Sequence, residues 1–75
     1  MNFKVLIIED EKNIADIIEH NLKREGFVTE CAYDGEDGLR RALEADCDLI
    51  LLDVMLPKLD GWDVLRTLRE QTFTP

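Results

Sequence analysis

The stretch DLILLDVMLPKLDG, residues 48–61, combines the most apolar run of the chain with a carboxylate directly behind it. Residues 48–52 predict a strand, because a continuous run of aliphatic side chains is typical of a parallel strand covered on both faces. Asp53 then stands at the tip of that strand. A buried strand has no use for a charge at its tip unless something there requires it. Asp53 is therefore the first candidate functional residue.

Two further strands and three helices are expected on either side of this stretch. Residues 3–8 (FKVLII) predict a buried strand, and the shorter, mixed run at residues 28–32 (VTECA) predicts an edge strand. Apolar residues three or four positions apart predict one sheet-facing stripe on each helix. In chain order the stripes are Ile14, Ile17, Ile18 and Leu22; Leu39, Ala42 and Leu43; and Val64, Leu65 and Leu68. The order β-α-β-α-β-α indicates a doubly wound α/β fold.

The ends of two helices are predicted from residue types that commonly begin or end helices. Gly26 supplies the stop for the first helix. Asp60 can cap the third helix, with Asp63 three residues on in a variant of the capping box. Within the first stripe, Asn21 is a polar misfit.

Acidic residues follow two of the three predicted strands. Glu9 and Asp10 come directly after the first strand, and Asp53 follows the third. Because ligands of an open parallel sheet bind outside the carboxyl ends of its strands, the three carboxylates converge if those strands are neighbours. Such a cluster repels itself unless a cation or shared protons relieve it, and oxygen ligands without His or Cys favour Mg²⁺. The competing interpretation is helix capping alone, which is the role expected for Glu11.

Composition limits the classes of function. With 75 residues the chain can form one small domain, and its net charge of −8 argues against direct contact with nucleic acid. No apolar run approaches the roughly 20 residues of a membrane helix, and no secretory signal is evident. Cys31 and Cys47 lack CxxC spacing. They are interpreted as reduced thiols, and a cytoplasmic location is predicted.

Three motifs resemble a known family. IIEDE after the first strand, LILLDVMLP around Asp53 and DGWDVLRTLR behind it resemble the receiver domain of two-component response regulators, and the resemblance runs over the whole chain. It implies a flavodoxin-like sheet with strand order 2-1-3. It makes Asp53 the phosphoacceptor, with Mg²⁺ held by Glu9, Asp10, Asp53 and the backbone carbonyl of Met55. The implied phosphoryl donor is a sensor histidine kinase. The implied role is that of a signalling domain, not an enzyme, with at most slow self-phosphorylation and dephosphorylation.

The chain departs from this family on its C-terminal side. Receiver domains have five strands and residues 1–75 supply three, so we expect a partial receiver domain that lacks the last two strands and helices. The strand ending in a Ser or Thr and the strand carrying a lysine, which both contact the phosphoryl group in the family, have no counterpart. The third strand then becomes a bare apolar edge, for which a homodimer by edge pairing or helix exchange is expected. DGWDVLRTLR also resembles receivers joined to winged-helix DNA-binding domains, so transcription regulation is the process expected of the parent protein.

The same residues bear on three alternative functions. The main alternative is a self-associating structural half-domain without phosphotransfer activity. A Mg²⁺-dependent phosphohydrolase with an aspartate nucleophile needs a second acid two residues later, where this chain has Met55. A dinucleotide-binding protein needs a glycine-rich turn after the first strand, which IIEDEKN does not supply. Lys12 and Lys58, near the mouth of the expected site, are interpreted as surface lysines.

Overall fold

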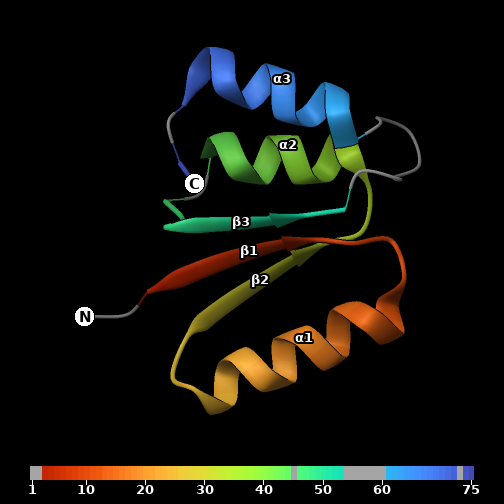
Figure 1. Ribbon diagram of the computed structural model, residues 1–75, viewed down its shortest axis with the longest axis vertical. Helices are drawn as coiled ribbons and strands as arrows, with labels where there is room; N and C mark the ends of the chain where they lie inside the picture. The colour runs from red at the N-terminus through yellow and green to blue at the C-terminus, as the bar shows by residue number, and fades with distance from the viewer. Residues whose placement is uncertain (1–2, 45, 54–60, 73) are drawn as a thin grey trace.

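The computed structural model describes residues 3–44, 46–53, 61–72 and 74–75. Within these ranges the elements follow the predicted order (Figure 1). They are β1 (Lys4–Ile8), α1 (Lys12–Arg24), β2 (Val28–Ala32), α2 (Gly35–Glu44), β3 (Leu49–Leu52) and α3 (Gly61–Gln71). The predicted ligand Met55, the predicted cap Asp60 and Lys58 lie outside the described residues. None of the helices in the described ranges has the length and apolar content that crossing a bilayer requires.

The three strands form one parallel sheet in the order β2-β1-β3, which confirms the predicted doubly wound architecture and strand order. Ile8 at the end of β1 lies beside Ala32 of β2 and Leu52 of β3. The Glu9 N–H then donates to the Ala32 carbonyl at 3.0 Å, and the Asp53 N–H donates to the Ile8 carbonyl at 3.0 Å. The carboxyl ends of all three strands therefore meet at one edge of the sheet.

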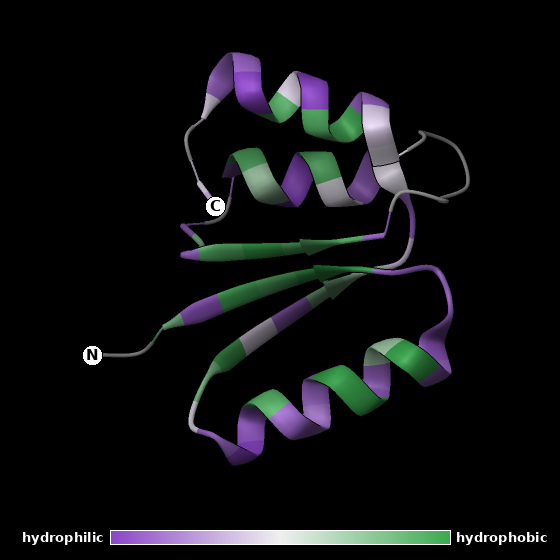
Figure 2. Cartoon of the chain, in the orientation of Figure 1, coloured by the Kyte–Doolittle hydropathy of each residue, from purple (hydrophilic) through white to green (hydrophobic). Residues whose placement is uncertain are grey.

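Helices cover both faces of the sheet, with α1 on one face and α2 and α3 on the other (Figure 1). The central strand β1 supplies both cores, because successive side chains of a strand point to opposite faces. Leu6 and Ile8 pack with α2 and α3, whereas Val5 and Ile7 pack with Ala15 of α1. This double burial explains the unbroken apolar run of the first strand. Figure 2 shows the same division, with largely hydrophobic strands between helices of mixed character.

The predicted sheet-facing stripe of α1 is only partly correct. Ala15 is fully buried and Ile18 packs against the same core, but Ile14 and Ile17 are 46% and 62% exposed. The line of side chains that faces the sheet includes Ala15 and Ile18, and it lies next to the line of Ile14 and Ile17 on the helix surface. Asn21 is exposed and continues the line of Ile14 and Ile17. Asn21, the polar residue within the predicted stripe, therefore belongs to the line of side chains that faces away from the sheet.

The ends of two helices follow their boundary residues. Gly26 has a φ of 94°, a conformation that favours glycine, and its N–H donates to the carbonyl of Lys23 at 3.0 Å. At the start of α2, Asp34 accepts the Asp37 N–H on Oδ1 at 2.8 Å. This contact satisfies one of the unpaired N–H groups of the first helical turn.

α2 and α3 pack together over the core that contains Leu6 and Ile8 (Figure 1). Ala42 of α2 and Val64 and Leu68 of α3 are buried as predicted. Leu43, also predicted to face the sheet, is 41% exposed. The reason is that α2 approaches the sheet through its smallest residues: a Cβ added at Gly38 would lie 2.7 Å from Cγ2 of Ile8. The bulkier Leu43 is left at the flank of the helix.

The C-terminal residues return to the outer edge of β3. The Ile50 N–H donates to the carbonyl of Pro75 at 2.7 Å. Arg69 of α3 donates to the carbonyl of Thr74 and holds this segment beside its own helix. The edge that was predicted to be bare therefore carries one backbone hydrogen bond in the part of the chain that the structure describes.

Candidate functional site

Three carboxylates converge at the carboxyl edge of the sheet. Glu9 and Asp10 follow β1, and Asp53 follows β3, which pairs with β1 in register. One carboxylate oxygen of each residue lies within 4.8 Å of the other two. Asp10 is exposed, whereas Glu9 and Asp53 are partly buried. The three acids that were expected to converge are thus brought together by the register of two parallel strands.

Glu9 is tied into the turn that leads to α1. Its Oε2 accepts the N–H of Glu11 at 3.2 Å. Glu11 occupies the N-cap position of α1, but its own side chain makes no capping hydrogen bond. The structure therefore places Glu11 at the cap position, as expected, but without a hydrogen bond from its side chain to the helix. The Glu9 carboxylate belongs both to this turn and to the carboxylate cluster.

The cluster is electrostatically strained. Partial burial raises the pKa of Glu9 above its ordinary value, and the neighbouring carboxyls of Asp53 and Asp10 raise it further, whereas the hydrogen bond from the Glu11 N–H acts in the opposite direction. Burial is the largest cause, and the neighbouring carboxyls add to it because nearby like charges cannot all ionise cheaply. A divalent cation placed among these oxygens would remove that repulsion.

The donor set fits Mg²⁺. All three side-chain donors are carboxylate oxygens, and within the described ranges no His or Cys belongs to the cluster. Mg²⁺ prefers such hard oxygen ligands, binds through few carboxylates and keeps several of its waters. A partly exposed group of three acids provides this combination. The fourth expected ligand, the carbonyl of Met55, falls outside the described residues.

A pocket of about 330 Å³ opens beside the cluster. It is lined by Glu9, Asp53, Ile7, Ile18, Leu51 and Leu52. Two carboxylates thus form its polar part, and aliphatic side chains of both strands and of α1 form the wall. An apolar wall with few polar groups is typical of a small-molecule site. The pocket leaves room next to Asp53 for a small incoming group.

A lysine and a tyrosine stand near this edge on the β2 side. Lys12 is the first residue of α1, and Tyr33 directly follows β2. The Lys12 Nζ lies 5.1 Å from the centroid of the Tyr33 ring, within the range of a cation–π interaction. Sequence reasoning treated Lys12 as a surface lysine and did not single out Tyr33. The available signal was the position of Tyr33 one residue beyond a strand that ends at the same edge.

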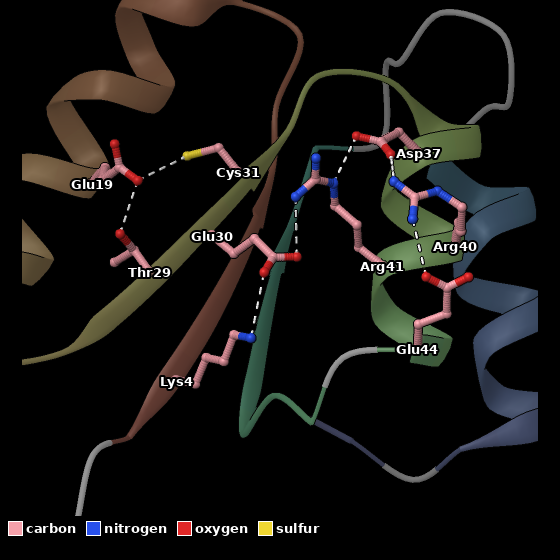
Figure 3. Close-up of polar contacts among 9 residues, drawn as sticks. All are labelled: Lys4, Glu19, Thr29, Glu30, Cys31, Asp37, Arg40, Arg41 and Glu44. Atoms are coloured by element: carbon pink, nitrogen blue, oxygen red, sulfur yellow. Dashed lines mark hydrogen bonds and ion pairs between the residues drawn. The ribbon is translucent and has the colours of Figure 1, made fainter.

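Charged side chains join α2 to the sheet away from this edge (Figure 3). Glu30 of β2 pairs with Lys4 of β1 at 3.4 Å and with Arg41 of α2 at 3.2 Å. Arg41 also pairs with Asp37 at 2.8 Å. Burial alone would raise the pKa of Asp37, but hydrogen bonds from Arg40 and Arg41 hold it below its ordinary value. This network fixes α2 against the strands.

On the opposite face, Glu19 links α1 to β2 (Figure 3). Its Oε2 accepts the Thr29 hydroxyl at 2.9 Å and the Cys31 thiol at 3.5 Å. Burial, followed by the negative charge of Glu19, raises the pKa of Cys31 to about 11. Because the thiolate is the reactive form, Cys31 is a structural thiol near neutral pH.

Known proteins with similar sequence and structure are receiver domains. The response regulator receiver domain family matches residues 5–75. The receiver domain of the Francisella response regulator 1452 is 39% identical, with a TM-score of 0.95 over 99% of this chain. The receiver domain of the sensor histidine kinase PA1611 from Pseudomonas aeruginosa PAO1, solved with a magnesium ion coordinated in its active site cleft, is 32% identical, with a TM-score of 0.89 over 95% of this chain.

A third similar structure contains a kinase. The complex of the histidine kinase ThkA with the response regulator TrrA, a protein from Thermotoga maritima, includes a chain that is 28% identical, with a TM-score of 0.87 over 93% of this chain. This chain spans 62%, 58% and 60% of the three matched chains. The chain matches this family from residue 5 to residue 75 and shares its flavodoxin-like sheet. Three carboxylates lie at the carboxyl edge of that sheet. The chain therefore belongs to the response regulator receiver domain family of two-component signalling.

Proposed function

We propose that this chain is a phosphoacceptor domain, in which Asp53 receives a phosphoryl group from the phosphohistidine of a sensor histidine kinase. The observation that carries the proposal is the placement of Asp53 at the end of β3, within 4.8 Å of the Glu9 and Asp10 carboxylates and beside a pocket. The similarity to a response regulator solved with its kinase supports the choice of donor.

In the proposed transfer of the phosphoryl group, Asp53 is the nucleophile. A carboxylate oxygen of Asp53 attacks phosphorus, the P–N bond to the donor imidazole breaks, and its electron pair returns to the imidazole nitrogen. The product is an acyl phosphate on Asp53, as in other covalent carboxylate chemistry. The backbone of Asp53 is held to β1 by its 3.0 Å hydrogen bond to Ile8, so the nucleophile is presented from a fixed strand end. Because the chain itself is the acceptor, we propose a signalling domain rather than an enzyme with a separate substrate.

Glu9, Asp10 and Asp53, with the carbonyl of Met55 as a proposed fourth ligand, would hold Mg²⁺ at this edge. The ion would supply positive charge that offsets the negative charge of the phosphoryl oxygens. The strained carboxylate cluster supports this assignment, because the raised pKa of Glu9 arises in part from its acidic neighbours. Glu9 and Asp10 then act as ligands, and Asp53 acts as both ligand and nucleophile.

The test is labelling with a small phosphodonor. The chain is incubated with acetyl phosphate and MgCl₂, and the product is mapped by mass spectrometry. We expect one added phosphoryl group on Asp53, none in Asp53→Asn, and strong dependence on Mg²⁺. Glu11→Gln serves as the control and should label like the starting chain, since its side chain lies outside the cluster. Label on another residue, or labelling independent of Mg²⁺, would contradict the proposal.

Self-association is the second candidate function, and the outer edge of β3 favours it. β3 is entirely aliphatic, and Leu51 is 37% exposed, whereas β1 is almost wholly buried. Apolar edge strands readily pair with another chain. A two-fold axis would join two β3 edges antiparallel in a homodimer, with the same surface used by both copies. Pairing along the whole edge would displace the Pro75 carbonyl from Ile50.

The two edges of the sheet provide a matched pair of variants for this second candidate. Leu51→Lys places a charge on β3, and Val28→Lys places one on β2, where Val28 is 40% exposed. Light scattering after size exclusion should show a dimer that Leu51→Lys dissociates and Val28→Lys retains. A folded monomer of the starting chain at micromolar concentration would exclude edge pairing.

A further inference from the structure

We infer that Tyr33 keeps the ammonium of Lys12 away from the carboxylate cluster and is thereby a positioning residue for metal binding. This inference rests on the proposed function, because it concerns the affinity of the cluster for Mg²⁺. Its starting observation is the 5.1 Å approach of Lys12 Nζ to the centroid of the Tyr33 ring. Neither residue belongs to the cluster itself.

The position of Lys12 in the chain makes this approach unexpected. Lys12 follows three consecutive acids, residues 9–11, and begins α1. A positive charge is unfavourable at the N-terminal end of a helix. A flexible four-carbon side chain at this point could turn toward the acids of its own loop. Within the described ranges, however, no ion pair joins Lys12 to a carboxylate, and the ammonium lies on an aromatic ring instead.

Tyr33 is well placed to take up this cation. It directly follows Ala32, whose carbonyl accepts the Glu9 N–H at 3.0 Å. The backbone that carries the ring is therefore joined to the backbone that carries the first carboxylate. Tyr33 is 37% exposed, and the face of its ring can bind an ammonium without desolvating it completely.

The two positions open to the Lys12 ammonium have opposite consequences for Mg²⁺. Over the Tyr33 ring, the ammonium does not compete with a metal ion for the carboxylate oxygens of the cluster. Turned toward Glu9 or Asp10, it would pair with them and compete with the metal ion for the same oxygens. A site that is competent in only a fraction of molecules binds with an affinity reduced by that fraction. Tyr33 thus raises the fraction of chains whose cluster can accept Mg²⁺.

The experiment is a titration of ¹⁵N-labelled chains with MgCl₂, followed by NMR at the amides of the cluster. An exposed cation–π contact changes the ratio of two populations about two- to fivefold, so Tyr33→Leu should weaken Mg²⁺ binding by up to that factor. Tyr33→Phe keeps the ring and should restore the starting affinity. Lys12→Gln removes the competing cation. Alone or combined with Tyr33→Leu, it should bind Mg²⁺ at least as tightly as the starting chain.

The outcomes separate this inference from the proposed function. Equal affinities of Tyr33→Leu and the starting chain would overturn the inference while leaving the metal site intact. A loss that persists in the Lys12→Gln background would also overturn it, because the ring would then act on the loop and not through Lys12. Absence of Mg²⁺ binding at Glu9, Asp10 and Asp53 in the starting chain would overturn the proposed metal site and the inference with it.

Discussion

Replacing Gly38 by alanine tests how closely α2 must approach the strand that carries the cluster. An added Cβ would lie 2.7, 2.8 and 2.9 Å from Cγ2, Cδ1 and Cγ1 of Ile8, which is fully buried. Two of these atoms are attached directly to the branched Cβ of Ile8, whose χ1 is stiff, so a simple rotation cannot relieve all three contacts. Either α2 or the end of β1 must move.

The magnitude follows from two opposing terms. Overpacking a core costs about 1–3 kcal/mol. Exchange of glycine for alanine inside a helix returns up to about 1 kcal/mol. We therefore expect Gly38→Ala to lower the free energy of unfolding by about 1–2 kcal/mol, which shifts the melting temperature of a chain of this size by roughly 4–16 °C.

Urea unfolding followed by circular dichroism measures this change, with the exposed Glu36→Ala on the same helix as the control, expected to lie within about 0.5 kcal/mol of the starting chain. Ile8→Val removes Cδ1, one of the three close atoms. Gly38→Ala should therefore be less damaging in the Ile8→Val background, with a coupling of about 0.5 kcal/mol or more. A stabilising Gly38→Ala, or the same loss in both backgrounds, would refute the close-approach argument.

Three further predictions concern the ionised groups. Mg²⁺ at a tenfold excess over its Kd should stabilise the chain by about 1.4 kcal/mol through mass action; thermal melts should show that Asp10→Ala loses most of this gain and Glu11→Ala little. Because the pKa of Glu9 is raised above 4.5, its contribution to stability is present at acid pH and is lost as the pH rises through its folded value. Without metal, Glu9→Gln should therefore stabilise the chain near neutral pH, as measured by urea unfolding across an acid-to-neutral series, and an unchanged pH profile would contradict the raised pKa of Glu9. The pKa of Asp37 is lowered below 3.8, so its contribution is present above that value and is lost as the pH falls through the folded pKa. Asp37→Asn should cost about 0.3–0.5 kcal/mol near neutral pH through the loss of its ion pairs with Arg40 and Arg41, and a deficit that persists in acid would show that these ion pairs are not the cause.

Local patterns in the chain were sufficient for the order of the elements and for the position of the acids. VLII (residues 5–8) and LILL (residues 49–52) are continuous apolar runs, and the structure shows them as adjacent parallel strands. Glu9, Asp10 and Asp53 were predicted to converge because each follows such a strand, and parallel strands end at a common edge. The order of the elements and the positions of the acids depend on residues that are neighbours in sequence, so short-range sequence patterns are enough to predict them.

Other features depended on contacts between distant segments. The spacing of apolar residues in α1 fits two adjacent lines on the helix, and only packing on β1 selected Ala15 and Ile18 over Ile14 and Ile17. The approach of Lys12 to Tyr33 requires β2 to end beside β1, and the hydrogen bond from Ile50 to Pro75 requires α3 to return the chain to β3. Periodicity states that a helix has an apolar side, but the register of the strands and the shape of the surface beneath it determine which residues that side buries. For the same reason the acids could be placed from sequence, whereas their electrostatic surroundings, set by side chains from three different segments, were decided only by the tertiary structure.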